Sequence, residues 1–213
     1  MDVSNYWKER GERYYDEFDD QPQYEKNRMI NQEKKMVEIL QNNNFNSILE
    51  IGCGFGRYTK ILNDIIAPRE FIALDISEDQ IKKAKKYVND QKVCFICNKI
   101  QEFVPNEKYD LVFAGEILMH IKPSEIESII KKMVECTSGK IITVDWYNDK
   151  KIGDERLGYC FMHDYELLFK KYGAINIKEH KISLSPKLKL ISKYAQIRGR
   201  TGIGTQSIFE VQV

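Results

Sequence analysis

Three glycines at alternate positions, directly after a short apolar run, constrain the fold of this chain more than any other feature. Residues 47–51 are mostly apolar and lead into Gly52, Gly54 and Gly56, and apolar residues then recur at helical spacing over 58–66. This pattern predicts a buried strand, a tight glycine turn and a helix. Glycine tolerates positive φ and lets a ligand approach the backbone, while the start of the helix offers unpaired N–H groups.

An acidic residue at the end of the next apolar run adds to this pattern. Residues 71–75 are predicted to be a second buried strand that ends in Asp75. Asp75 lies 75 − 56 = 19 residues after Gly56, close to the separation of about 20 expected for a carboxylate that binds a ribose diol. Dinucleotide dehydrogenases carry G-x-G-x-x-G at this turn, whereas Thr59 stands where their third glycine falls. A dehydrogenase is therefore a remote alternative, which titration with NADH would test.

With Glu50 before the first glycine, the pattern E-x-G-x-G-x-G plus the distal acid resembles motifs I and II of the class I S-adenosylmethionine (SAM)-dependent methyltransferases. The resemblance runs from about residue 45 to residue 144 and continues more loosely beyond. It implies an α/β fold: a Rossmann-like, seven-stranded, mostly parallel sheet with an antiparallel C-terminal hairpin and an N-terminal helical lid. A single domain over 1–213 is expected, with 1–42 as the lid and 43–213 as the core.

Local patterns indicate where some of these elements begin and end. Apolar spacing over 28–42 predicts a helix, and Ser77 with Gln80 three residues later is typical of a capping box at a helix start. Alternating residues over 175–182 and 206–213 predict the last two strands.

The resemblance also implies which residues hold SAM and its product, S-adenosyl-L-homocysteine. The backbone of the three glycines should follow the methionine part and the ribose, Asp75 should bind the ribose hydroxyls, and Ile76 should pack on adenine. Glu50 should either orient the glycine loop or reach the SAM amino group through water. Arg57 should either bind the SAM carboxylate or be exposed. The expected cofactor residues are Glu50, Gly52, Cys53, Gly54, Gly56, Asp75, Ile76, Asn98, Ile100 and Gly115.

One cofactor contact departs from the family pattern. Members usually place an acid opposite the adenine amino group, where this chain has Asn98 and Lys99. Asn98 or Gln101 would then supply that hydrogen bond.

Three residues are candidates for the catalytic role. If the acceptor is a hydroxyl, a general base helps, and histidine titrates in the useful range. His120 follows the predicted fourth strand and His163 precedes a helix after the fifth, so both face the cleft in the family layout. A structural role remains open for each of them. Tyr14 is a third candidate, as a lid residue that touches the methyl donor, and a neutral amine acceptor would need no strong base.

The composition limits the class of protein. The 213 residues are 42% hydrophobic and 31% charged with a net charge of +1, which is typical of a soluble globular domain and argues against a polyanion partner. No apolar run approaches the roughly 20 residues that span a bilayer, and the N-terminus lacks a signal-peptide core, so a cytoplasmic protein is expected. The five cysteines are scattered and expected to be reduced, with Cys94 and Cys97 as a buried structural pair. The three histidines lie far apart, and no metal site is expected.

The acceptor is the least determined feature. No N-P-P-Y or D-P-P-Y tetrapeptide follows the fourth strand, where residues 114–117 stand instead. No acidic residue lies between Lys181 and Phe209, so this basic stretch is either solvated or a patch for phosphate or carboxylate. We expect a methyltransferase acting on oxygen or nitrogen of a small acceptor, with anionic, phosphorylated and sugar-linked compounds as options, in a monomer or homodimer. The alternatives are an RNA or protein methyltransferase and a non-catalytic SAM-binding partner subunit.

Overall fold

The computed structural model describes residues 3–11, 20–21, 23–147, 152–153, 155–156, 160–182 and 206–213. Tyr14 and most of the basic stretch between Lys181 and Phe209 lie outside these described residues. In the part of the chain that is described, no helix is both long and apolar enough to cross a membrane.

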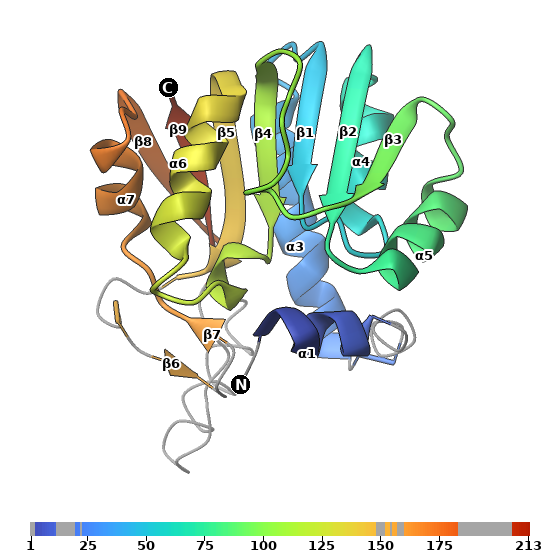
Figure 1. The fold of residues 1–213 in the computed structure, drawn as a ribbon, viewed down its shortest axis with the longest axis horizontal. Coiled ribbons are helices and arrows are strands. Elements are labelled where there is room, and N and C mark those ends of the chain that lie inside the picture. The colour runs from blue at the N-terminus through green and yellow to red at the C-terminus, as the bar shows by residue number, and fades with distance from the viewer. Residues whose placement is uncertain are drawn as a thin grey trace.

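A seven-stranded sheet forms the centre of the molecule, in the order β3-β2-β1-β4-β5-β9-β8 (Figure 1). The first five strands are parallel, whereas β9 runs antiparallel to both of its neighbours, β5 and β8. This confirms the predicted Rossmann-like sheet with its antiparallel C-terminal pair. The strands are β1 (Ser47–Ile51), β2 (Glu70–Asp75), β3 (Val93–Cys97), β4 (Tyr109–Gly115), β5 (Thr137–Trp146), β8 (Asn176–Ile182) and β9 (Gln206–Gln212), and a separate pair joins β6 (Glu155–Arg156) to β7 (Cys160–Phe161).

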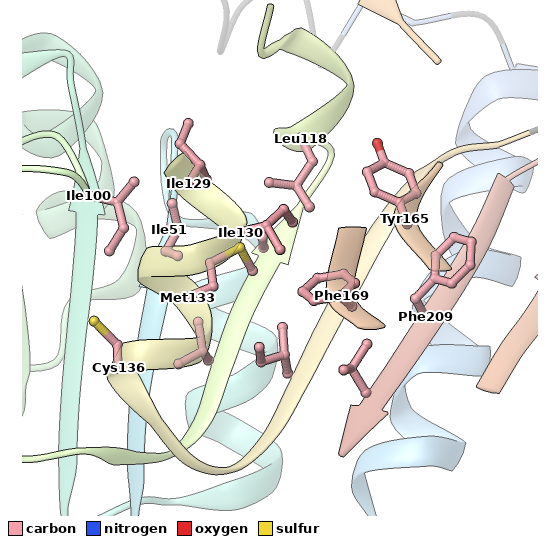
Figure 2. Packing of buried hydrophobic residues seen from close by; sticks show 14 of the residues in the cluster. Ile51, Ile100, Leu118, Ile129, Ile130, Met133, Cys136, Tyr165, Phe169 and Phe209 are labelled. Atoms are coloured by element: carbon pink, nitrogen blue, oxygen red, sulfur yellow. The ribbon is translucent and has the colours of Figure 1, made fainter. Parts of the chain in front are cut away.

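Helices cover both faces of the sheet because its strands are apolar on both sides. Leu49 and Ile51 of β1 pack with α6 (Ile126–Cys136) and α7 (Tyr165–Lys171), in the core drawn in Figure 2. Ile48, the residue before Leu49, belongs to the opposite core, which contains residues of α3 (Gln23–Leu40), α4 (Arg57–Ile66) and α5 (Glu78–Val88). Successive residues of a strand point to opposite faces, so one run of apolar residues supplies both cores.

The remaining helices lie at the edge where the parallel strands end. There α1 (Val3–Arg10) crosses below the sheet, and the short 3-10 turn η1 (Leu118–His120) follows β4 (Figure 1). In open α/β sheets, ligands bind outside the carboxyl ends of the strands, so these two elements border the expected site.

Two local expectations need correction. The helix predicted over 28–42 begins at Gln23, because its polar first turn is held by local side-chain pairs such as Arg28 Nε–Glu25 Oε2 at 2.6 Å rather than by an apolar face. Ser77 caps α5 as predicted, accepting from Gln80 N. The capping box is incomplete, however, because the Gln80 side chain donates to the Gly11 carbonyl and Ser77 N–H donates to Asp75.

The cysteines of β3 also differ from expectation. All five cysteines are free thiols, as expected, but Cys94 and Cys97 are exposed rather than buried. The physical reason is that β3 is an edge strand of the sheet, so it has a neighbouring strand on one side only.

Candidate functional site

The glycine turn takes backbone conformations that other residues rarely adopt. Gly52, Gly54 and Gly56 have φ values of 70°, 56° and 94°. A Cβ added to Gly52 would lie 2.7 Å from Ile117 Cγ1, and one on Gly56 would lie 2.9 Å from Val88 Cγ2. Glycine is therefore required at these two positions by both conformation and space.

Asp75 is bonded directly to this turn. Its Oδ2 accepts from Gly54 N at 2.8 Å, and its Oδ1 accepts from Ser77 N at 2.9 Å. Burial raises the pKa of Asp75, although the N–H groups of Ser77 and Gly54 act to lower it. Each oxygen uses one lone pair on the backbone, which leaves further acceptor capacity for a ligand.

The turn and Asp75 line one pocket at the carboxyl ends of the strands. Its walls include Ile76, Gly115 and His120. Trp7 of the N-terminal helix α1 also lines it. The Trp7 and His120 rings are in contact, with centroids 4.5 Å apart. The N-terminal helix α1 and the turn after β4 therefore share one cavity.

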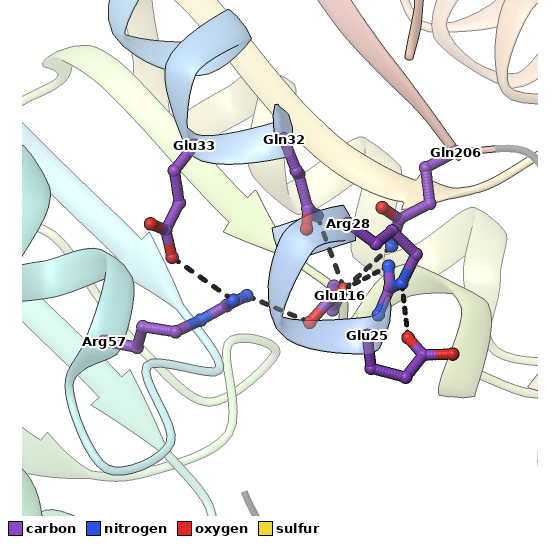
Figure 3. Close-up of polar contacts among 7 residues, drawn as sticks. All are labelled: Glu25, Arg28, Gln32, Glu33, Arg57, Glu116 and Gln206. Atoms are coloured by element: carbon purple, nitrogen blue, oxygen red, sulfur yellow. Dashed lines mark hydrogen bonds and ion pairs between the residues drawn. The ribbon is translucent and has the colours of Figure 1, made fainter. Parts of the chain in front are cut away.

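Glu116, in the same pocket, is the hub of a polar network that sequence reasoning missed (Figure 3). Its Oε1 accepts from Gln206 Nε2 at 2.8 Å, from Gln32 Nε2 at 3.3 Å and from Arg28 Nη1 at 3.4 Å, while its Oε2 accepts from Arg57 Nη2 at 3.0 Å. We call these five residues the Glu116 junction. Burial alone would raise the pKa of Glu116, but Arg57 and Arg28 outweigh it and lower the pKa below its ordinary value. The junction thus holds a carboxylate anion.

Comparison with known proteins identifies the core. Residues 48–139 match the family described as "Methyltransferase domain". The chain is 37% identical over 91 residues to a malonyl-[acyl-carrier protein] O-methyltransferase of Anoxybacillus flavithermus, which covers 41% of this chain and 35% of that protein. It is 35% identical over 95 residues to phosphoethanolamine N-methyltransferase 3 of Arabidopsis thaliana, and this match covers 43% of this chain and 19% of that protein.

The match of residues 48–139 therefore supports the resemblance to the class I SAM-dependent methyltransferases that the sequence pattern indicates. The matched region spans only about a third of the malonyl-[acyl-carrier protein] relatives and less of the phosphoethanolamine one.

Solved structures support the fold beyond the region that the family model matches. The magnesium protoporphyrin IX methyltransferase of Synechocystis PCC 6803, with bound S-adenosyl-L-homocysteine, superposes with a TM-score of 0.70 at 15% identity and covers 99% of each chain. The N-methyltransferase NodS of Bradyrhizobium japonicum WM9, with the same product, gives 0.67 at 15% identity, covering 91% of this chain and 89% of that one. At this identity the likeness concerns the fold.

Six of the ten expected cofactor residues line the pocket. They are Gly52, Cys53, Gly54, Asp75, Ile76 and Gly115. Gly56 instead caps α4, and Ile100 is buried in the core shared with α6. Asn98 also lies off the pocket: its N–H donates to the Asp75 carbonyl and its Oδ1 accepts from Lys99 N.

For two charged residues, the structure distinguishes between the roles that the sequence left open. Glu50 is buried and its Oε2 accepts from Thr59 Oγ1 at 2.5 Å, so it holds the first turn of α4 and does not line the pocket. Arg57 is buried as well, so of its two alternatives the exposed position is wrong. It lines the pocket within the Glu116 junction and also pairs with Glu33.

The two histidines differ in position. His120 is buried and faces the pocket, with Nδ1 3.6 Å from Cys160 Sγ. His163 lies outside the pocket, and its Nε2 donates to the Ile121 carbonyl at 2.9 Å. Burial lowers the pKa of His163 and favours a neutral ring. His163 is thus placed to fix the chain after η1, while His120 reaches the cavity. Among the described residues, no group of three or more potential metal ligands is close enough to hold an ion.

The signals for the missed residues are weak in the sequence. Glu116 contacts Arg28, Gln32 and Gln206, which are 88, 84 and 90 positions away. No local spacing rule relates residues so distant, and only the place of Glu116 directly after a predicted strand could have drawn attention to it.

Proposed function

We propose that this protein is a SAM-dependent methyltransferase that transfers a methyl group to oxygen or nitrogen of a small acceptor. The observation that carries the proposal is the hydrogen bond between Asp75 and Gly54 N, which places a carboxylate and a glycine cradle in one pocket. The match of residues 48–139 to a methyltransferase domain supports it, and so does the SAM product bound in solved structures of similar fold.

The residues present fit the cofactor. Gly54 leaves room where a side chain would stand, and Asp75 keeps acceptor capacity for a ribose diol. Ile76 offers an apolar surface for adenine. When bound, SAM supplies a methyl group on a positively charged sulfur, which is already activated for attack by a nucleophile.

The protein's part is to orient the acceptor, exclude water and accept a proton where one is released. His120 is the described residue best placed to accept it, because it lines the pocket and its ring is held against Trp7. Trp7 would also keep water away from the reacting atoms, which suits the proposed role of residues 1–42 as a lid. Tyr14, within that lid, stays a prediction.

Calorimetry with SAM and S-adenosyl-L-homocysteine tests the cofactor site. We expect both to bind, and Asp75→Ala to weaken binding about 10- to 100-fold, because about 1–3 kcal/mol of hydrogen bonding to the ribose is lost. Asp79→Asn is the matched control, since Asp79 lies four residues on in α5 and does not line the pocket. Wild-type affinity in Asp75→Ala, or no binding by the unaltered protein, would refute the proposal.

The acceptor is best sought by measuring SAM consumption over classes of compound. The matched relatives are named for an O-methylated acyl-carrier substrate and an N-methylated phosphorylated amine. We therefore propose to compare carboxylates, phosphorylated metabolites, sugar-linked compounds and amines. Small RNAs are the comparison for the alternative RNA methyltransferase, which would show tight, salt-sensitive RNA binding.

A further inference from the structure

Glu116 stands at an unusual backbone position. It follows the last residue of β4 and has φ 58°, a left-handed conformation that costs a non-glycine residue about 1–3 kcal/mol. Its own N–H continues the sheet, donating to the Val144 carbonyl at 2.6 Å. A residue with a strained backbone persists at the edge of a pocket only where its contacts outweigh the strain.

Those contacts come from three elements far apart in the sequence. Arg28 and Gln32 belong to α3, Arg57 begins α4 and Gln206 begins β9. The side chains of Arg28, Arg57 and Glu116 are only 7%, 10% and 14% exposed, so the ion pairs are shielded from water and salt. Loss of the carboxylate would leave two shielded guanidinium groups without this partner, which is costly.

The two glutamines are oriented by the same carboxylate. Gln32 and Gln206 both point their amide nitrogens at Glu116 Oε1, and their own buried oxygens have no hydrogen-bond partner among the described residues. Turning either amide over would bring its oxygen against the carboxylate, so Glu116 fixes both side chains at the cost of unsatisfied oxygens.

We infer that Glu116 is a positioning residue that ties the floor of the pocket to the docking of α3 and β9. The floor is the backbone of 115–117, and Ile117 lies directly over Gly52, so a shift at Glu116 moves the surface that faces the glycine turn. Arg28, Gln32 and Gln206 do not line the pocket, and each of them contacts Glu116, which does. The inference rests on the proposed function for its ligand, S-adenosyl-L-homocysteine.

The test compares variants inside and outside the pocket. Arg28→Met removes a contact to Glu116 without touching the pocket, Glu116→Gln removes the charge, and a double variant combines them. Glu210→Gln is the matched control, because Glu210 is also a partly buried acid, paired with Lys140 and His180 on the sheet away from the pocket. Affinity for S-adenosyl-L-homocysteine is measured by calorimetry, and amide hydrogen exchange at 115–117 is measured without ligand.

We expect Arg28→Met to weaken binding about fivefold or more and Glu116→Gln about tenfold or more, with faster exchange at 115–117 in both. The double variant should match Glu116→Gln, because the two changes break one link. Glu210→Gln should bind normally. If Arg28→Met does not fold, Gln206→Leu tests the same link from β9.

Three results would overturn the inference. They are unchanged exchange at 115–117 in Arg28→Met, additive losses in the double variant, and an equal loss of affinity in Glu210→Gln at equal thermal stability. Failure of every protein, wild type included, to bind the ligand would refute the proposed function instead, and the exchange at 115–117 would still decide the role of Glu116.

Discussion

Glu50 illustrates how its surroundings set the chemistry of a single carboxyl group. It is the fourth of the five residues of β1, is 1% exposed and is hydrogen-bonded to Thr59. Burial raises the pKa of Glu50 from 4.5 to about 8, although the Thr59 hydroxyl acts to lower it. The residue that introduces the glycine motif is therefore a neutral acid in the folded protein at pH 7.

This shift predicts a pH dependence of stability. Between pH 4.5 and about 8 the folded protein keeps the Glu50 proton while the unfolded chain has lost it. The free energy of unfolding should therefore fall as pH rises through this window, by roughly 3–5 kcal/mol in total. Glu50→Gln should flatten this fall, which denaturant titrations of both proteins at pH 5, 6.5 and 8.5 would measure. Parallel pH curves for the two proteins would contradict the assignment.

Gly115 is required by space rather than by conformation. A Cβ there would lie 2.5 Å from the ring of Tyr58, which lines the pocket. Gly115→Ala should destabilise the protein by about 1–3 kcal/mol and weaken SAM binding, because Tyr58 must move. Gly173→Ala is the control: φ there is 100° and no atom of the described residues lies within 4 Å of an added Cβ, so stability should fall while affinity stays unchanged. Thermal unfolding and calorimetry would separate the two effects.

At the residue scale, the sequence predicted what depends on local spacing. The glycines and Asp75 are adjacent in the structure because a strand, a turn and a helix bring them together in order. Asn98 and Ile100 were placed on the pocket by family pattern, but the backbone after β3 directs them elsewhere. The Glu116 junction was not predictable, since its members meet only after the sheet has formed.

At the scale of elements, the carbonyl group of Gly11, directly after α1, is hydrogen-bonded to two side chains of α5. The Gly11 carbonyl accepts from Gln80 Nε2 at 3.2 Å and from Lys83 Nζ at 3.0 Å. Gly11 also allows a close approach, because a Cβ there would lie 2.4 Å from Ser77 Oγ. These two hydrogen bonds thus hold the proposed lid against α5, the helix that follows Asp75.

Loss of the hydrogen bond between Lys83 and the Gly11 carbonyl should increase local opening of α1 without unfolding the core. Lys83→Met removes one donor, and Lys82→Met is the control, because Lys82 is exposed and pairs with Asp79 instead. Hydrogen exchange over residues 3–11 should rise about fivefold in Lys83→Met, as expected for about 1 kcal/mol, and remain unchanged in Lys82→Met. Equal exchange in both variants would show that the contact does not hold the lid.

Element boundaries were predicted unevenly for a related reason. Apolar periodicity marks α4 and α6, but the first turn of α3 is polar and shows no such pattern. Likewise the apolar run of β3 resembles a buried strand, and only the strand order reveals that it lies at an edge.

At the scale of the whole molecule, β9 is an interior strand of the sheet although it is the last strand in the sequence. It lies between β5 and β8, with Val211 beside both Ile141 and Ile177. Deleting residues 206–213 should therefore unfold the protein, since β5 and β8 lose their common partner and Glu116 loses Gln206. Deleting Val213 alone removes one backbone bond, to Gly139, and should be tolerated. Circular dichroism and thermal melts would compare the two truncations.

The position of β9 also bears on how the chain reaches its native state during synthesis. The ribosome delivers β5 and β8 before the strand that must sit between them. Until residues 206–212 emerge, β5 presents an unsatisfied row of amides and carbonyls, a surface on which nascent chains associate. Cellular folding factors that shield exposed strands would therefore matter most in the interval between the translation of His180 and that of Gln212.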